Sequence, residues 1–298
     1  MIEVRVPATT ANLGPGFDCL GLALQLHNTV ELELADGFEV EITGEGEHTL
    51  ARDERNLVLQ AALRLAERAA KTVPGLRLTQ HNAIPLARGM GSSSAAIVGG
   101  LVAANALLEL QMDRSELLDL AAEIEGHPDN VAPALLGGLT VCCFEGELLC
   151  ERFPAPDGLT AVVAVPDFTV STEEARLVMP RDVPHADAVY NTTHAAVTLA
   201  SLLSGNYDLL QGAMRDRLHQ PYRAHLVPGF EATLQAALDA GALGAAMSGS
   251  GPTLIAFARG REAEIAEAMQ QTFAAFGVRA ETMSLRLDDI GAQVVERV

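Results

Sequence analysis

Residues 85–96, P-L-A-R-G-M-G-S-S-S-A-A, combine residue types that suit phosphate binding. Gly89 and Gly91 can adopt backbone angles that other residues avoid, and they let a ligand approach the main chain closely. Any of Ser92 to Ser94 can cap the alanine-rich helix that follows. The first turn of that helix leaves N–H groups unpaired, and its dipole favours negative charge. The segment therefore predicts a phosphate-binding turn, with a surface turn before a buried helix as the plain alternative.

This turn departs from the Walker pattern, which needs a lysine after its last glycine. The chain contains a single lysine, Lys71, which is distant from the turn in sequence. A phosphate site at the turn must therefore use backbone N–H groups, hydroxyls, an arginine or a metal ion.

Five polar side chains fall close together at the end of a predicted helix: Glu123, Glu125, His127, Asp129 and Asn130. They suit a hard cation and a polar substrate, since Mg²⁺ takes one or two carboxylates together with phosphate oxygens. Only one of the two glutamates needs to face the site, and a solvated helix end is the favoured interpretation of Glu125. Zinc is not indicated, because His127 has no partner at ligand spacing.

Further candidates are spread along the chain. Asn12 and Asp18 lie in a glycine-rich loop, where turn chemistry explains both residue types equally well. Arg176 and Arg223 lie among the helices of the second half, where most arginines are surface charges. Residues 248–252, S-G-S-G-P, form a second glycine turn between two predicted strands, and a tight bend is its plain alternative.

Periodicity predicts the elements that position these residues. Residues 30–34 and 38–42 alternate as a hairpin around Asp36-Gly37, Pro7 ends the first strand, and Asp113 with Glu116 predicts a capping box. In the first half we expect strands at 2–6, 30–34, 38–42, 76–79, 138–144 and 148–153, and helices at 56–71, after the phosphate turn, and at 113–125.

The second half follows a linker at residues 154–158, so the chain is predicted to divide into 1–155 and 156–298. Strands and helices mix without strict alternation, which favours an α+β layout of two sandwiched halves over a doubly wound sheet. The predicted elements are strands at 159–165 and 278–284, a strand–turn–strand unit within 241–257, and helices at 172–178, 185–203, 207–218, 229–240 and 261–276.

Composition excludes some partners. The net charge of −19 argues against nucleic acid and anionic membranes, but not against ATP, because Mg²⁺ and helix N-termini override the global field locally. Residues 89–108 are uncharged and long enough to span a bilayer, yet Gly99, Gly100 and Asn105 favour a helix buried in protein. The four cysteines lack metal-ligand spacing and no signal peptide is visible, so we expect reduced thiols in the cytoplasm.

Three glycine-rich segments occur in order: residues 7–18, P-A-T-T-A-N-L-G-P-G-F-D; residues 85–96; and residues 244–253, G-A-A-M-S-G-S-G-P-T. Together they resemble the three motifs of the GHMP small-molecule kinases, and the likeness spans the whole chain. Within that superfamily the chain resembles the homoserine kinase branch, because Asn12 stands where the mevalonate and galactose branches have a lysine or arginine. The E-G-H-P-D-N-V-A-P-A-L-L-G-G and S-T-E-E-A-R runs are also similar to that branch.

The resemblance implies a fold and an activity. The fold would be α+β, with an N-terminal half like ribosomal protein S5 domain 2 and a ferredoxin-like C-terminal half. The activity would be transfer of the γ-phosphate of ATP, with Mg²⁺, to the side-chain hydroxyl of L-homoserine, on the threonine route. Two alternatives stay open: a kinase of the superfamily that acts on another alcohol, and an inactive ligand-binding member. The sequence allows a homodimer but does not determine the oligomeric state.

The resemblance also implies individual roles. Ser93 and Glu123 match the metal ligands, and Glu125 does not. Homoserine is a zwitterion, so Asp18 would pair with its ammonium group while the arginines bind its carboxylate. The implied ATP loop is Pro85, Leu86, Ala87, Arg88, Gly89, Met90, Gly91, Ser92, Ser93, Ser94 and Ala95. The implied substrate contacts are Asn12, Asp18, His127, Asn130, Thr172, Arg176 and Arg223; Glu123, Asn130, Asp129 and Arg176 are the implied catalytic set.

Asp129 stands where mevalonate kinase has an aspartate near the reacting hydroxyl. The resemblance to the homoserine kinase branch implies that no side-chain base is placed there, which phosphoryl transfer permits, because the protein mainly positions groups and neutralises charge. We therefore hypothesise that Asp129 is structural or orients Asn130.

Overall fold

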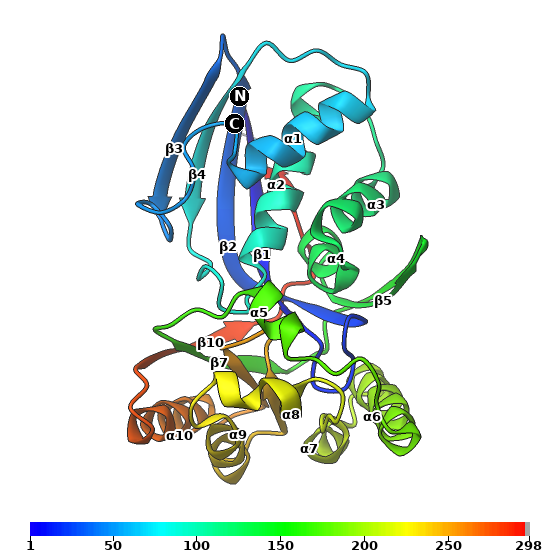
Figure 1. Cartoon of the computed structure of the whole chain (residues 1–298), viewed down its shortest axis with the longest axis vertical. Coiled ribbons are helices and arrows are strands. Elements are labelled where there is room, and N and C mark those ends of the chain that lie inside the picture. Colours follow the sequence, from blue (N-terminus) through cyan, green and yellow to red (C-terminus); the bar gives the residue numbers. More distant parts are fainter. Residues whose placement is uncertain (296–298) are drawn as a thin grey trace.

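A computed structural model describes residues 1–295 as two halves, one above the other, each built from a sheet with its own helices (Figure 1). The predicted α+β architecture of two halves is confirmed. The elements of the first half are β1 Ile2–Ala11, β2 Leu20–Leu34, β3 Phe38–Gly44, α1 Leu57–Arg68, β4 Leu76–Asn82, α2 Ser92–Leu107, α3 Arg114–Glu125, α4 Pro128–Leu136, β5 Leu139–Glu145 and β6 Glu147–Phe153.

The first sheet has the order β11-β1-β2-β4-β3, and β5 and β6 continue it from β2. The predicted hairpin of β2 with β3 is wrong, because β4 lies between them and pairs in parallel with β3. Parallel pairing requires a crossover, which α1 supplies. The prediction that Pro7 ends β1 is also wrong: the pairing register shifts between Pro7 and Ala8, and the strand continues to Ala11.

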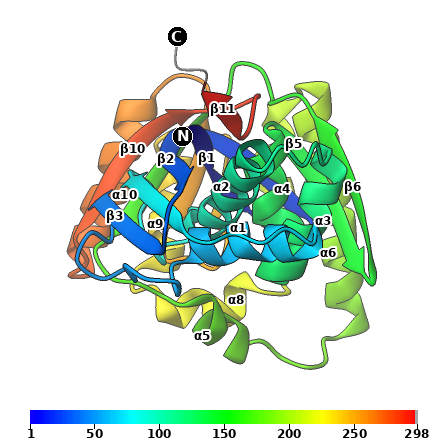
Figure 2. The same cartoon turned by 90° about the horizontal axis from the view of Figure 1, so that it is seen from above.

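Helix α2 is the buried centre of the first half. It packs between β1 and β2 on one side and α1 on the other (Figure 2). A Cβ on Gly100 would lie 2.3 Å from the carbonyl oxygen of Val58, so glycine allows the two helices to approach closely. The predicted buried helix is therefore confirmed. None of the helices in residues 1–295 combines the length and the apolar character that crossing a bilayer requires.

The second half has a sheet of order β10-β7-β9-β8, antiparallel throughout. This order, with helices after the first and third strands, is the ferredoxin-like arrangement that the resemblance implies. Its elements are β7 Thr160–Pro166, α5 Thr172–Leu177, α6 His185–Ser204, η1 Tyr207–Leu209, α7 Leu210–Ala213, α8 Gln220–Arg223, η2 Ala224–Leu226, α9 Phe230–Asp239, β8 Gly244–Met247, β9 Leu254–Ala258, α10 Glu262–Ala275, β10 Ala280–Arg286 and β11 Gln293–Val295.

Two details differ from the predicted second half. The helix predicted at 207–218 ends at Ala213, and the carboxylate of Asp216 then accepts hydrogen bonds from the backbone N–H groups of the next turn. Strand β11 pairs with β1, so the chain returns to the first sheet. The boundary between 155 and 156 stays a prediction, and residues 296–298 of the predicted second half lie outside the described residues.

Candidate active site

The three glycine-rich segments meet between the two sheets. The Ser248 hydroxyl lies 2.9 Å from the Thr10 hydroxyl and 2.6 Å from the carbonyl oxygen of Gly89. The Gly249 N–H donates to the carbonyl oxygen of Ala11 at 3.2 Å. A Cβ on Gly89 would lie 2.2 Å from the Ser248 carbonyl oxygen, so this contact requires glycine. Segments far apart in sequence thus form one floor beneath a polar cavity.

The N-terminus of α2 opens onto this cavity. Gly91 precedes the helix with φ of 70°, and no side chain caps the first turn by a hydrogen bond. A Cβ on Gly91 would lie 1.9 Å from the Thr9 hydroxyl oxygen, so only glycine fits. Gly91, Ser92, Ser93 and Ser94 line the cavity. The positive end of the helix dipole can therefore act on an anion bound there.

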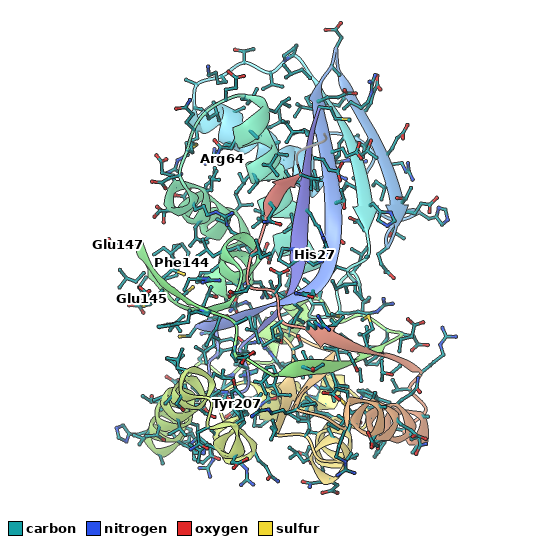
Figure 3. All side chains as sticks on the ribbon, turned by 180° about the vertical axis from the view of Figure 1, so that it is seen from behind. His27, Arg64, Phe144, Glu145, Glu147 and Tyr207 are labelled. Carbon is teal, nitrogen blue, oxygen red and sulfur yellow. The ribbon has the colours of Figure 1, made fainter. Side chains whose placement is uncertain are left out.

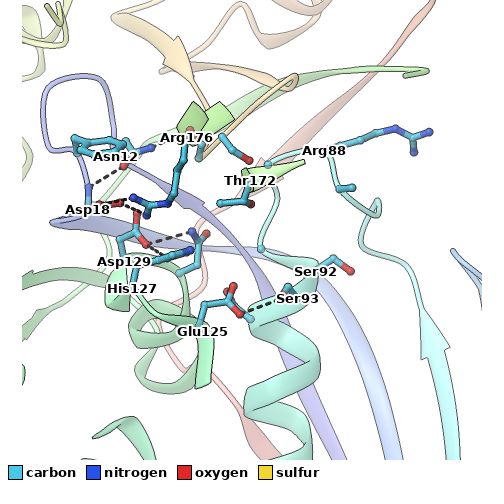
Figure 4. Close-up of a pocket in the computed structure, with 18 of the residues that line it drawn as sticks. Asn12, Asp18, Arg88, Ser92, Ser93, Glu125, His127, Asp129, Thr172 and Arg176 are labelled. Atoms are coloured by element: carbon cyan, nitrogen blue, oxygen red, sulfur yellow. Dashed lines mark hydrogen bonds and ion pairs between the residues drawn. The ribbon is translucent and has the colours of Figure 1, made fainter. Parts of the chain in front are cut away.

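Glu125, not Glu123, stands beside these serines. The hydroxyls of Ser93 and Ser94 donate to the two carboxylate oxygens of Glu125 at 2.8 and 2.9 Å (Figure 4). Glu123 lies on the outer face of α3, where both of its carboxylate oxygens accept from Arg68. The predicted placement of Glu123 next to Ser93 is wrong, as is the interpretation of Glu125 as a solvated helix end. The reason is helix geometry: residues two apart point about 200° away from each other.

The start of α4 carries a hydrogen-bonded row. His127 Nδ1 lies 2.7 Å from Asp129 Oδ1, and the Thr9 hydroxyl donates to Asn130 Oδ1 at 2.7 Å. Asp129 and Asn130 are buried. Burial opposes the charged form of His127, but the hydrogen bond to Asp129 and the charges of Asp129 and Glu125 outweigh it and raise the pKa of His127. This row forms one wall of the cavity.

Asp18 and Arg176 form an ion pair in the wall of the cavity. The Arg176 guanidinium donates to both carboxylate oxygens of Asp18 at 2.8 and 3.1 Å (Figure 4). Asn12 supports this loop, since its side chain accepts from the Asp18 N–H and donates to the Gly249 carbonyl oxygen. Asp18 adopts φ of 53°, a left-handed conformation. The segments that carry Asp18 and Arg176 are therefore held in place by side-chain contacts from both halves.

Arg223 is buried, with 2% of its surface exposed, and it forms no salt bridge with any carboxylate of residues 1–295. Its Nε donates to the Ala175 carbonyl oxygen at 3.0 Å, and its Nη1 lies 3.3 Å from His219 Nδ1. Burial, and then the nearby charge of Arg176, lower the pKa of Arg223. A buried cation at a cavity wall is suited to pair with an anion that enters the cavity.

Phe17 lines the cavity and His219 is buried next to it, but neither was among the residues singled out from sequence. The Phe17 ring stacks on His219 with centroids 5.1 Å apart, and the guanidinium carbons of Arg176 and Arg223 lie 5.6 and 5.1 Å from its centroid. His219 Nε2 lies 2.6 Å from the Gly14 carbonyl oxygen, which holds the Phe17 loop. Proximity to Asp18 could have indicated Phe17; no sequence signal indicated His219.

Only some residues of the predicted ATP loop line the cavity. Ala87, Arg88, Gly89 and the serines line it, whereas Met90 and Ala95 are buried in the core. In Figure 4 the Arg88 side chain extends away from the serines, and with Pro85 it lines another hollow.

A second cavity, of about 480 Å³, adjoins the first, and Ala87, Ser92, Ser93 and Thr172 line both. Its wall includes Leu50, Leu57, Leu86 and Ala96 and is largely apolar.

Comparison with known proteins identifies the family. The profile for the GHMP kinases N terminal domain matches residues 56–138, and that for the GHMP kinases C terminal matches residues 198–275. A homoserine kinase from Moorella thermoacetica is 48% identical over 98% of this chain and 99% of its own length. The chain belongs to the homoserine kinase family.

Other members of the family agree with this assignment. A homoserine kinase from Desulfitobacterium hafniense is 48% identical over 99% of this chain and 100% of its own length. The crystal structure of homoserine kinase from Cytophaga hutchinsonii has a TM-score of 0.89 at 34% identity, covering 99% of this chain and 97% of that one. The expected membership of the GHMP superfamily and of its homoserine kinase branch is confirmed.

Proposed function

We propose that this chain transfers the γ-phosphate of ATP to the side-chain hydroxyl of L-homoserine, giving O-phospho-L-homoserine on the route to threonine. Its place among the homoserine kinases supports this activity. The observation that carries the proposal is the contact of Ser93 and Ser94 with Glu125 at the open end of α2. There, an apolar cavity and a cavity lined by opposite charges meet.

ATP would lie across the two cavities. The second cavity is large enough for a nucleoside and offers the apolar walls that a base requires. From there the triphosphate would reach the first turn of α2, whose N–H groups and dipole favour its charge. Because Ser92 and Ser93 line both cavities, the γ-phosphate would enter the polar one.

Mg²⁺ would bind at Glu125 with the serine hydroxyls. Within residues 1–295 no group of three or more His, Cys, Asp or Glu residues is arranged to hold a metal. One carboxylate beside two hydroxyls nevertheless fits Mg²⁺, which usually takes one or two carboxylates and completes its shell with phosphate oxygens and water. When bound, the ion would neutralise phosphate charge. In this proposal Glu125 replaces Glu123 as the acidic ligand, and Ser93 keeps its predicted role.

L-Homoserine would bind among the charged residues of the polar cavity. Arg223 is a buried cation without a carboxylate partner in residues 1–295, so the carboxylate of the amino acid would form an ion pair with its guanidinium. One carboxylate oxygen of Asp18 would leave Arg176 and accept from the ammonium group of the substrate. Arg176 would then donate, together with Arg223, to the substrate carboxylate. The remaining predicted contacts line the same cavity: Asn12, His127, Asn130 and Thr172.

The chain would act mainly by holding the hydroxyl in line with the phosphate. Asp129 is buried and already engaged with His127, which supports the hypothesis that it is structural rather than a base. The attacking hydroxyl would pass its proton to the transferred phosphate, as phosphoryl transfer through a loose transition state allows. A cytoplasmic location and a homodimer stay predictions of the sequence.

The direct test measures ADP release with L-homoserine, L-threonine, mevalonate and galactose side by side. We expect the rate of ADP release with L-homoserine to be at least about tenfold above the rate with mevalonate or galactose, because the charged cavity selects a zwitterion. Faster turnover of mevalonate or galactose would refute the assignment. ATP binding without any turnover would point instead to an inactive ligand-binding member.

A further inference from the structure

Two thiols touch each other midway along the β5–β6 hairpin. Cys142 on β5 is directly opposite Cys150 on β6, and the Cys142 thiol donates a hydrogen bond to the Cys150 sulfur at 3.1 Å. Figure 3 shows the tip of this hairpin, marked by Phe144, Glu145 and Glu147, projecting from the body of the molecule. The proposed kinase reaction uses neither thiol.

The backbone around Cys142 determines which kind of pair the two cysteines form. The Cys142 N–H donates to the Cys19 carbonyl oxygen at 2.9 Å, away from β6. In an antiparallel strand the N–H and the carbonyl of one residue point to the same side, so Cys142 and Cys150 are a non-hydrogen-bonded pair. Such pairs have Cα atoms about 4.5 Å apart, and disulfides span Cα separations of about 4.4–6.8 Å. Closing a bond would move the sulfurs by about 1 Å and leave the strands paired.

We propose that Cys142 and Cys150 form a dithiol site that closes reversibly into a cross-strand disulfide on reaction with a small-molecule disulfide. The thiolate of Cys150 attacks one sulfur of the oxidant R–S–S–R, forming a mixed disulfide and releasing R–S⁻. That leaving thiolate takes the proton from Cys142. The Cys142 sulfur then attacks the Cys150 sulfur and releases the second R–S⁻, which takes up the proton that Cys150 lost when its thiolate formed. Two protein thiols are oxidised while one oxidant molecule is reduced to two R–SH.

The environments of the two cysteines assign the order of these steps. Cys150 is partly exposed and meets the oxidant, whereas Cys142 is buried behind it. The hydrogen bond from Cys142 lowers the pKa of Cys150 despite its partial burial. Burial raises the pKa of Cys19, which keeps that thiol in its less reactive form. Cys143 alternates to the other face of β5 and is exposed, so it serves as the matched control.

The test oxidises the folded, full-length chain with oxidised glutathione, blocks the remaining thiols with N-ethylmaleimide and measures the intact mass and the linked peptides. We expect the number of free thiols to fall from four to two and the mass of the chain to fall by two hydrogen atoms. Peptide mapping should find one cross-linked peptide that joins Cys142 and Cys150. Dithiothreitol should restore all four. A cross-link that involves Cys19 or Cys143, or a stable glutathione adduct on Cys150, would overturn the proposal.

Variants separate the two steps. Cys142→Ser should stop at a mixed disulfide on Cys150, whereas Cys150→Ser should prevent the cross-link. Cys143→Ser should leave cross-linking within about twofold of the wild-type rate, since that side chain faces away. Because peptide mapping of the wild-type chain identifies the linked residues by itself, a variant that fails to fold does not remove the test. Equal loss of cross-linking in Cys143→Ser would contradict the assigned pair.

Discussion

Glu125→Gln is expected to lower kcat by about 10²- to 10³-fold, while Glu123→Gln leaves kcat within about twofold of wild type. Both glutamates lie on α3, two residues apart, so the pair is a matched comparison. The carboxylate of Glu125 accepts from two serine hydroxyls at the N-terminus of α2. Within residues 1–295 the carboxylate of Glu123 accepts only from Arg68, and the side chains of Glu123 and Arg68 are about half exposed.

The magnitude follows from where each charge lies. A unit charge about 4 Å from another contributes about 4 kcal/mol at the effective dielectric near a protein surface, which corresponds to about a thousandfold in rate. Glutamine keeps the shape of Glu125 and one acceptor oxygen but loses that charge. The ion pair of Glu123 is exposed, so its loss costs about 0.2–1 kcal/mol of stability and has no direct effect on the reaction.

The assay is the initial rate of ADP release at saturating L-homoserine, with Mg²⁺ titrated at fixed ATP. Circular dichroism and thermal unfolding check that each variant is folded. A folded Glu125→Gln enzyme with kcat within about threefold of wild type and an unchanged Mg²⁺ requirement would refute the reasoning. An equal loss in Glu123→Gln would refute it as well, because Glu123 lines a separate hollow and not the cavity.

Three further predictions concern the polar cavity. Arg223→Met should raise the KM for L-homoserine at least about thirtyfold, since removing one partner of a buried charge pair costs about 2–5 kcal/mol. The KM for ATP should change little, and Arg217→Met, at an exposed arginine, is the control. Asp129→Asn should retain more than about a thousandth of wild-type kcat, and a larger loss in a folded enzyme would establish it as a general base. The raised pKa of His127 means that its protonated form stabilises the fold in acid. This contribution is complete below about pH 6.5 and is lost as the pH rises through the folded pKa. The free energy of unfolding should therefore differ most between wild type and His127→Gln at low pH, and a difference that grows with pH would contradict this.

Local chemistry explains why much of the fold could be predicted. The capping box of Asp113 and Glu116 forms as expected, because it depends only on residues three apart. The β5–β6 hairpin also forms as predicted, since alternation and a central glycine determine its pairing. The turn at Gly89 and Gly91 stood out for a similar reason: both positions need a conformation that glycine alone adopts without strain.

Long-range packing decided the rest. Residues 30–34 and 38–42 have the pattern of a hairpin, but β4 contributes a better-buried partner and lies between them. Two alternating glutamates look equivalent in sequence, and only the packing of α3 against α1 and α2 directs Glu125 to the serines and Glu123 to Arg68.

Amino-acid types and spacing alone predicted an anion-binding helix start, two α+β halves and a cluster of oxygen and guanidinium groups. Only the tertiary structure decided which of those groups share a cavity, because a side chain's direction depends on which face of its helix or strand is buried. The same cause explains the contact of Phe17 with two arginines. That contact joins elements whose packing no local pattern specifies.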